Sequence, residues 1–77
     1  MIPLELLGSG HWADVADLHG EPGWVSRMAE LGLQPGSRIR MIRSGSPCLL
    51  LVGDARLCLR GDWAMRIMVR PVSVGAR

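Results

Sequence analysis

The sequence contains no phenylalanine, tyrosine or lysine, and it contains no long apolar run. Its longest uninterrupted apolar stretch, Cys48 to Val52, falls far short of the roughly 20 residues that a membrane-spanning helix needs. The N-terminal residues MIPLELLG lack the charged start and apolar segment of a signal peptide. We therefore expect a cytoplasmic protein with no direct membrane insertion. In that compartment its two cysteines are expected to be free thiols.

The positive charge of the chain is spread out rather than concentrated. The nine basic residues are all arginines, they are scattered from Arg27 to Arg77, and the net charge is +2. No run of them forms the arm or stripe that neutralises nucleic-acid phosphates, so no nucleic-acid partner is expected. A solvated face of strands accounts for the arginines more simply.

A chain of 77 residues has room for one small domain, which we place at residues 1–71 with a loose tail at 72–77. Alternating apolar residues predict five short strands. An apolar stripe at i, i+4 and i+7, made of Trp24, Met28 and Leu31, predicts one helix of about two turns after Pro22. We expect Pro71 to end the last strand and Asp62 to cap a single turn before it. The fold class is therefore all-β with one short inserted helix, and a small five-stranded barrel is favoured over a sandwich.

The stretch ELGLQPGSRI, Glu30 to Ile39, predicts an abrupt helix end followed by a tight turn. Gly32 fits the left-handed position that ends a helix, and Leu33 after it fits the hydrophobic contact of a Schellman ending. Pro35 and Gly36 fit the two central positions of a type II turn. These three residues, Gly32, Pro35 and Gly36, are the predicted structural positions.

A hairpin is predicted around Gly53-Asp54, with Val52 paired to Ala55. This register places Cys48, with Leu50 and Val52, in the core and puts Leu49, Leu51 and Cys58 on the outer face. Exposed apolar residues on a small domain indicate a protein contact. The alternative is that the helix or the segment Leu4 to Leu7 folds over this face. The complete set of predicted partner-binding residues is Leu49, Leu51, Cys58, Met68, Trp12 and Trp63.

Catalysis is not indicated. The sequence has no phosphate-binding glycine loop, no paired carboxylates on one helix face, and no local set of His, Cys and Asp. His11, His19 and Cys58 are weak candidate metal ligands, because none of them forms a C-x-x-C or H-x-x-x-H pair. No cofactor is therefore predicted, and weak binding of a divalent metal stays open. An ion shared between two subunits would be easier to build than a site within one chain.

Two stretches, RMAELGLQPGSRIRMI and LRGDWAMRIMV, together resemble the FeoA family, the small cytosolic partner of the bacterial ferrous iron transporter FeoB. The resemblance runs from about Leu4 to Val69 and implies an SH3-like barrel with a helix inserted after the first strand. It implies a non-enzymatic accessory or regulatory protein of ferrous iron uptake that docks on the cytosolic part of FeoB. Such a protein would be cytoplasmic and peripheral to the inner membrane through the transporter.

A second hypothesis is a transition-metal-binding SH3-like domain that self-associates in response to metal. The same barrel occurs as the C-terminal module of metal-dependent repressors, but the residues present include no helix-turn-helix, so that function is not carried over. The sequence leaves open whether regulation is activating or inhibitory, which transporter surface is touched, and whether a homo-oligomer forms.

Overall fold

The structure is a computed structural model that describes residues 1–73. Of the predicted tail at residues 72–77, residues 74–77 lie outside the described part of the chain, and Val72 belongs to the last strand. The elements follow in the order β1 (Ile2–Pro3), the 3-10 helix η1 (Leu4–Leu6), β2 (Trp12–Leu18), α1 (Pro22–Glu30), β3 (Arg38–Arg43), β4 (Cys48–Val52), β5 (Ala55–Leu59), the 3-10 helix η2 (Trp63–Met65) and β6 (Ile67–Val72).

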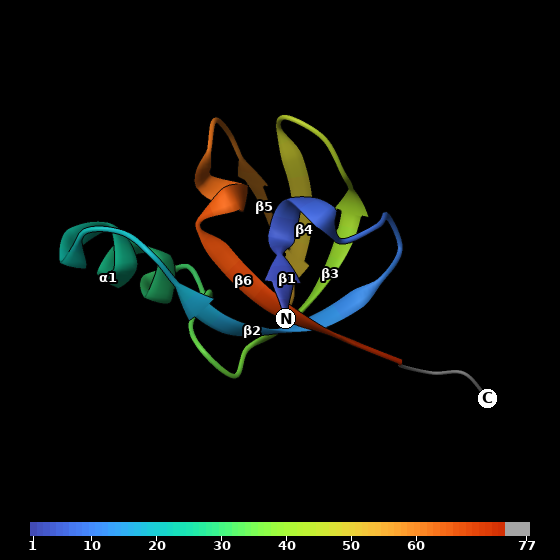
Figure 1. Cartoon of the computed structure of the whole chain (residues 1–77), viewed down its shortest axis with the longest axis horizontal. Helices are drawn as coiled ribbons and strands as arrows, with labels where there is room; N and C mark the ends of the chain where they lie inside the picture. Colours follow the sequence, from blue (N-terminus) through green and yellow to red (C-terminus); the bar gives the residue numbers. More distant parts are fainter. Residues whose placement is uncertain (74–77) are drawn as a thin grey trace.

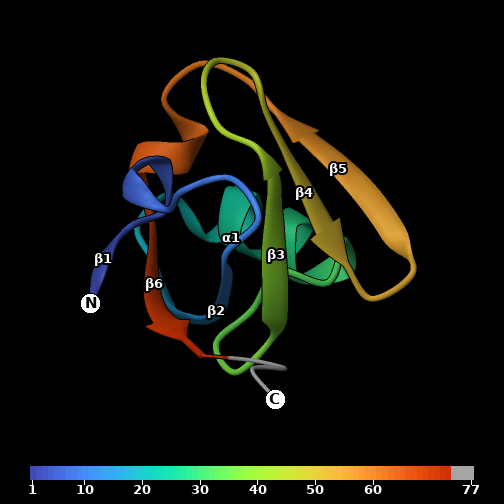
Figure 2. The same cartoon turned by 90° about the vertical axis from the view of Figure 1, so that its right-hand side faces the viewer.

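The strands form one antiparallel sheet in the order β1-β6-β2-β3-β4-β5. The sheet curls around a common interior, and α1 lies at one end of it (Figures 1 and 2). The mostly β fold with one short helix is confirmed, and the five predicted strands correspond to β2 through β6. The two-residue strand β1 adds a sixth. The sheet is not closed, so β1 and β5 are its two edges.

Helix α1 begins at Pro22, which has no N–H to leave unpaired, and ends as predicted. Gly32 has a φ of 98°, in the left-handed region. The Leu33 N–H donates to the Met28 carbonyl over 2.8 Å, and the Gly32 N–H donates to the Ala29 carbonyl over 2.9 Å. These two bonds define a Schellman motif. Leu33 and Met28 are both fully buried, which supplies its hydrophobic contact.

The turn after α1 leads into β3 and is hydrogen-bonded to β2. Gly36 has a φ of 96°, and the Ser37 N–H donates to the Gln34 carbonyl over 2.9 Å, as a type II turn requires. The Gly36 N–H donates to the Val15 carbonyl and the Val15 N–H donates to the Ser37 carbonyl, each over 2.8 Å. The turn is therefore tied to the bulged part of β2, which fixes the direction in which β3 starts.

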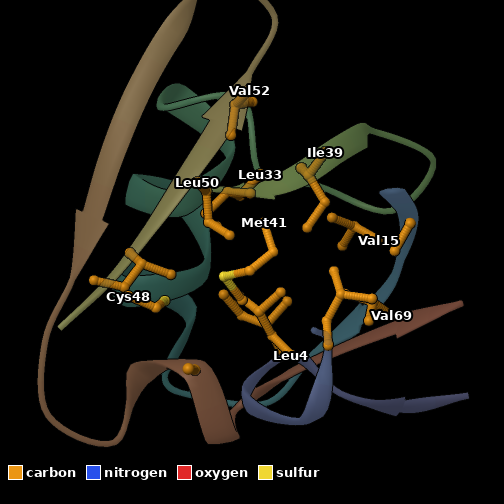
Figure 3. Close-up of a cluster of buried hydrophobic side chains, with 14 of the residues drawn as sticks. Leu4, Val15, Leu33, Ile39, Met41, Cys48, Leu50, Val52 and Val69 are labelled. Carbon is orange, nitrogen blue, oxygen red and sulfur yellow. The ribbon is translucent and has the colours of Figure 1, made fainter. Parts of the chain in front are cut away.

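The predicted hairpin register is confirmed, because Val52 pairs with Ala55 and Cys48 pairs with Leu59. Cys48, Leu50 and Val52 point into the interior together with residues from the other strands and from η1 (Figure 3). The core cluster consists of Leu4, Leu7, Ala13, Val15, Leu18, Met28, Leu33, Ile39, Met41, Cys48, Leu50, Val52, Leu59, Ala64, Ile67 and Val69.

Three details of the sequence prediction are wrong. Leu31 was expected in the buried stripe but is 42% exposed, because the Schellman ending turns the chain so that Leu33 enters the core instead. Pro71 does not end the last strand, since β6 continues to Val72. It is tolerated there because β1 pairs with β6 only at Met68 and Val69, which leaves that edge of β6 free beyond them.

The third concerns Asp62, which precedes η2 as expected but makes no side-chain cap. Its carboxylate instead accepts hydrogen bonds from the guanidinium of Arg66, 3.2 Å away. Asp62 has φ −94° and ψ 13°, outside the extended backbone conformation that a side-chain N-cap normally has, so its carboxylate is not placed to accept from the first N–H groups of η2.

Candidate partner-binding surface

The outward side of the β4–β5 hairpin carries the apolar residues that the sequence predicted there. Leu49 and Leu51 are half-buried, and Cys58, opposite Leu49 on β5, is exposed. We call the outward residues Leu49, Leu51, Arg56 and Cys58 the outer hairpin face. Strand alternation places all four on the side of the sheet opposite to Leu50.

Leu49 and Leu51 of the outer hairpin face are half-buried and do not belong to the hydrophobic core. The half-buried hydrophobic residues that pack against the core are Ile2, Trp24, Val25, Leu57 and Trp63, and Leu49 and Leu51 are not among them. Leu4 and Leu7 lie in the core with Met28, on the inner side of the sheet. The buried residues of the N-terminal segment and of α1 therefore lie on the side of the sheet opposite to Leu49 and Leu51.

Trp12 lies on the same outward side of the sheet. It pairs with Arg40, Arg40 pairs with Leu51, and Leu51 pairs with Arg56, so the four residues form one row across β2, β3, β4 and β5. The Arg40 guanidinium carbon is 5.8 Å from the centre of the Trp12 ring. This cation–π contact covers part of the indole, while both side chains stay accessible.

Trp63 is shared between the core and the surface. Its ring meets the edge of Trp24 with centroids 6.1 Å apart, and it packs against the core cluster. It also lines an open surface hollow together with Cys58, Arg60 and Gly61. Trp63 thus lies next to Cys58 of the outer hairpin face, at the end of β5.

Met68 is separate from these residues. It is half-buried on β6 and pairs with Pro3 on one side and Asp17 on the other. The structure therefore joins Leu49, Leu51, Cys58 and, along one row, Trp12, but it places Met68 beyond β2.

A second apolar site was missed by the sequence reasoning. Leu6 on η1 is 66% exposed and Met65 on η2 is 57% exposed, and the two 3-10 helices contact each other. They lie together at one end of the curled sheet (Figure 2). The only sequence signal was the cluster of three leucines at positions 4, 6 and 7, because a single 3-10 turn can bury just one side.

The candidate metal ligands are not brought together. His11 precedes β2 and His19 follows it, so the length of the strand keeps them more than about 20 Å apart. Within residues 1–73 there is no group of three or more His, Cys, Asp or Glu side chains that could hold an ion. His19 and Asp17 come closest to forming part of a metal site. Nε2 of His19 is 3.4 Å from Oδ2 of Asp17, and both side chains are exposed.

Charge on the outward side of the sheet is partly neutralised at one place. Arg38 donates to Asp14 through Nε over 2.7 Å and through Nη2 over 3.3 Å. The hydrogen bond from Arg38 is the main reason why the pKa of Asp14 lies below its ordinary value. On the inner side, burial raises the pKa of the Cys48 thiol, in keeping with its predicted role as a core residue.

Comparison with known proteins identifies the class of protein that this fold and surface define. The model of the FeoA domain matches residues 2–71. A crystal structure of an iron uptake regulatory protein, FeoA, superposes with a TM-score of 0.85 at 29% identity, covering 92% of this chain and 97% of that one. The solution structure of FeoA from Chlorobium tepidum gives 0.86 at 27% identity, covering 94% and 71%. No curated protein matches the sequence.

A third relative carries functional information of its own. FeoA from Stenotrophomonas maltophilia, crystallised with zinc, is 30% identical, with a TM-score of 0.77 and coverage of 90% of this chain and 89% of that one. It is an SH3 domain protein for which a role as a ferrous iron transport activating factor has been suggested. The chain thus has an SH3-like fold. It belongs to the FeoA family.

Proposed function

We propose that this protein is a non-enzymatic accessory protein of ferrous iron uptake that docks by protein contact on the cytosolic part of the transporter FeoB. Membership of the FeoA family supports the link to iron transport. The observation that supports docking is the outer hairpin face, where Leu49 and Leu51 are only half-buried and lie on the side of β4 opposite to the core residue Leu50. The protein would then act at the inner membrane through the transporter. Within residues 1–73, no helix is long and apolar enough to cross a bilayer.

The chemistry of the described residues suits a binding role better than a catalytic one. Cys48, the buried thiol, is removed from solvent and its raised pKa keeps it protonated. Asp14 is engaged by Arg38, and Asp62 is engaged by Arg66. A general base or nucleophile needs a reactive group free within hydrogen-bond reach of a substrate in a pocket, and these groups do not provide one.

Iron uptake in cells tests this proposal. We expect ferrous iron uptake to fall several-fold when the gene is deleted and to recover when the wild-type chain is supplied. The Leu51→Glu variant should fold but fail to restore uptake, because it replaces the apolar side chain at the centre of the contact with a carboxylate that docking must strip of water. Arg27→Glu, which also adds negative charge but lies exposed on α1, is the matched control and should restore uptake.

The proposal would be contradicted by normal uptake in the deletion strain. It would also be contradicted if Leu51→Glu restored uptake as well as Arg27→Glu did, since docking would then not use the outer hairpin face.

A second candidate function is self-association in response to a divalent metal. Two observations favour it: the zinc complex of the S. maltophilia relative and the pairing of His19 with Asp17 on an exposed surface. A histidine and a carboxylate from each of two copies would supply the four ligands of a tetrahedral zinc site. His11 has no such carboxylate neighbour among the ion pairs of residues 1–73.

Solution mass with and without Zn(II) tests this second function. We expect Zn(II) to convert the monomer to a dimer, and His19→Ala to remain monomeric with the metal present. His11→Ala is the matched control and should dimerise as the wild type does. An unchanged wild-type mass in Zn(II), or dimerisation of His19→Ala, would remove the hypothesis.

A further inference from the structure

Three arginines flank the two leucines of the outer hairpin face. Leu51 on β4 has Arg40 of β3 on one side and Arg56 of β5 on the other. A bulge in β3 after Met41 brings Arg43 opposite Leu49. All three arginines are exposed. Three of the nine arginines of the sequence thus converge on one surface because of how the strands pair.

These three arginines have no acidic partner within residues 1–73. The ion pairs there join Arg38 to Asp14, Arg66 to Glu21 and Asp62, and His19 to Asp17. Arg40 donates to the Gly10 carbonyl and lies over the Trp12 ring, and neither contact neutralises its charge. The carboxylates nearest to the face along the chain are Asp14, which Arg38 already engages, and Asp54 in the hairpin turn. The face therefore carries uncompensated positive charge around an apolar centre.

The dimensions of this face match an α-helix. Adjacent strands are about 4.8 Å apart, so Arg40 and Arg56 stand about 10 Å apart across Leu51, close to the diameter of a helix. Leu49 and Leu51 are about 6.8 Å apart along β4, close to the rise of about 6 Å between positions i and i+4 of a helix. A helix lying along β4 would set its apolar stripe on the leucines and its flanks against the arginines.

We propose that the outer hairpin face, with Arg40 and Arg43 beside it, binds an acidic amphipathic helix: one apolar stripe on Leu49 and Leu51, with carboxylates on both sides of it. Charge complementarity selects this occupant, because opposite potentials steer the encounter and fix the orientation of the helix. The identification of that helix as part of the transporter rests on the proposed function, whereas the chemistry of the face does not.

Two other occupants fit less well. A second copy of the chain would bring two positively charged faces together, which like-charge repulsion disfavours. A nucleic acid would meet leucines at the centre of the face, where it needs hydrogen-bond donors or stacking rings. The one indole in the row, Trp12, lies at the far end of that row on β2 and is partly covered by Arg40.

Fluorescence anisotropy with a synthetic peptide tests the proposal. The probe is a labelled helix of about four turns, with leucines at i, i+4, i+7 and i+11 and glutamates on both flanks. The comparison probes are the same peptide with lysine in place of glutamate, a labelled single-stranded oligonucleotide, and vesicles of phosphatidylserine and phosphatidylcholine. We expect binding of the acidic peptide alone, weakening as salt is added.

Charge reversal locates the site. Arg56→Glu and Arg43→Glu should each raise the dissociation constant of the acidic peptide at least about tenfold. Each variant replaces an attraction between the face and the peptide with a repulsion. Both side chains are exposed and make no side-chain hydrogen bond or ion pair in residues 1–73, so circular dichroism should show unchanged folding. Arg27→Glu on α1 is the matched control and should bind as the wild type does.

The proposal is overturned if the acidic peptide does not bind, whether or not the oligonucleotide or the vesicles bind. It is also overturned if Arg27→Glu weakens peptide binding as much as Arg56→Glu does. The iron uptake experiment tests the accessory role independently of peptide binding. Loss of uptake on deletion together with no peptide binding would reject the acidic helix and keep the accessory role.

Discussion

Replacing Gly32 by valine is expected to lower the free energy of unfolding by about 3 kcal/mol. Gly32 holds a φ of 98°, which strains any side chain and a β-branched one most. A Cβ atom there would also lie only 2.9 Å from Cγ1 of Val52, so the end of α1 would be pushed away from β4. Urea or thermal unfolding measures the loss.

Gly36→Val is the matched control for this prediction. Gly36 has nearly the same φ, 96°, but a Cβ added there meets nothing within 4 Å. Gly36→Val should lower the free energy of unfolding only by the backbone strain, about 1 to 2 kcal/mol. The difference in unfolding free energy between the two variants then measures the clash with Val52. A Gly32→Val protein as stable as the wild type would show that the helix does not end in this conformation.

Replacing Leu50 by glutamate is expected to unfold the domain, whereas the same change at Leu51 should leave it folded. Leu50 is fully buried and points into the core, so a carboxylate there is left desolvated without a partner (Figure 3). The cost is about 4 kcal/mol or more, comparable to the whole stability of a chain of this size, on the order of 5 kcal/mol.

Leu51 points to the opposite side of β4, beside Arg40 and Arg56, where a carboxylate can stay hydrated. Leu51→Glu should change the free energy of unfolding by less than about 1 kcal/mol. Circular dichroism and thermal unfolding of the two variants side by side give the answer. If Leu51→Glu unfolds the protein and Leu50→Glu does not, the inner and outer faces of the hairpin are exchanged.

The parts of this fold that the sequence predicted correctly are those set by local chemistry. Gly32 and Leu33 determine the helix end, Pro35 and Gly36 determine the turn, and Gly53-Asp54 determines the hairpin register. In each case a few adjacent residues favour one backbone conformation strongly, so no knowledge of distant contacts was needed.

The parts that could not be predicted depend on pairing between distant segments. Arg40 and Leu51 become neighbours only through the register of β3 against β4, and Arg43 joins them only because of the bulge. For the same reason the sequence reasoning interpreted the arginines as scattered. Leu6 and Met65 are exposed together because η1 and η2 meet, and these segments are far apart along the chain.

Co-purification with the transporter tests the central claim most directly. The tagged chain, the Leu51→Glu variant and the Arg27→Glu variant would each be expressed with FeoB, the membranes solubilised in mild detergent, and the amount of transporter retained on the affinity resin compared. We predict that the wild type and Arg27→Glu retain the transporter and that Leu51→Glu, although folded, loses it. Equal retention by Leu51→Glu and the wild type, or no retention by the wild type, would contradict docking through the outer hairpin face.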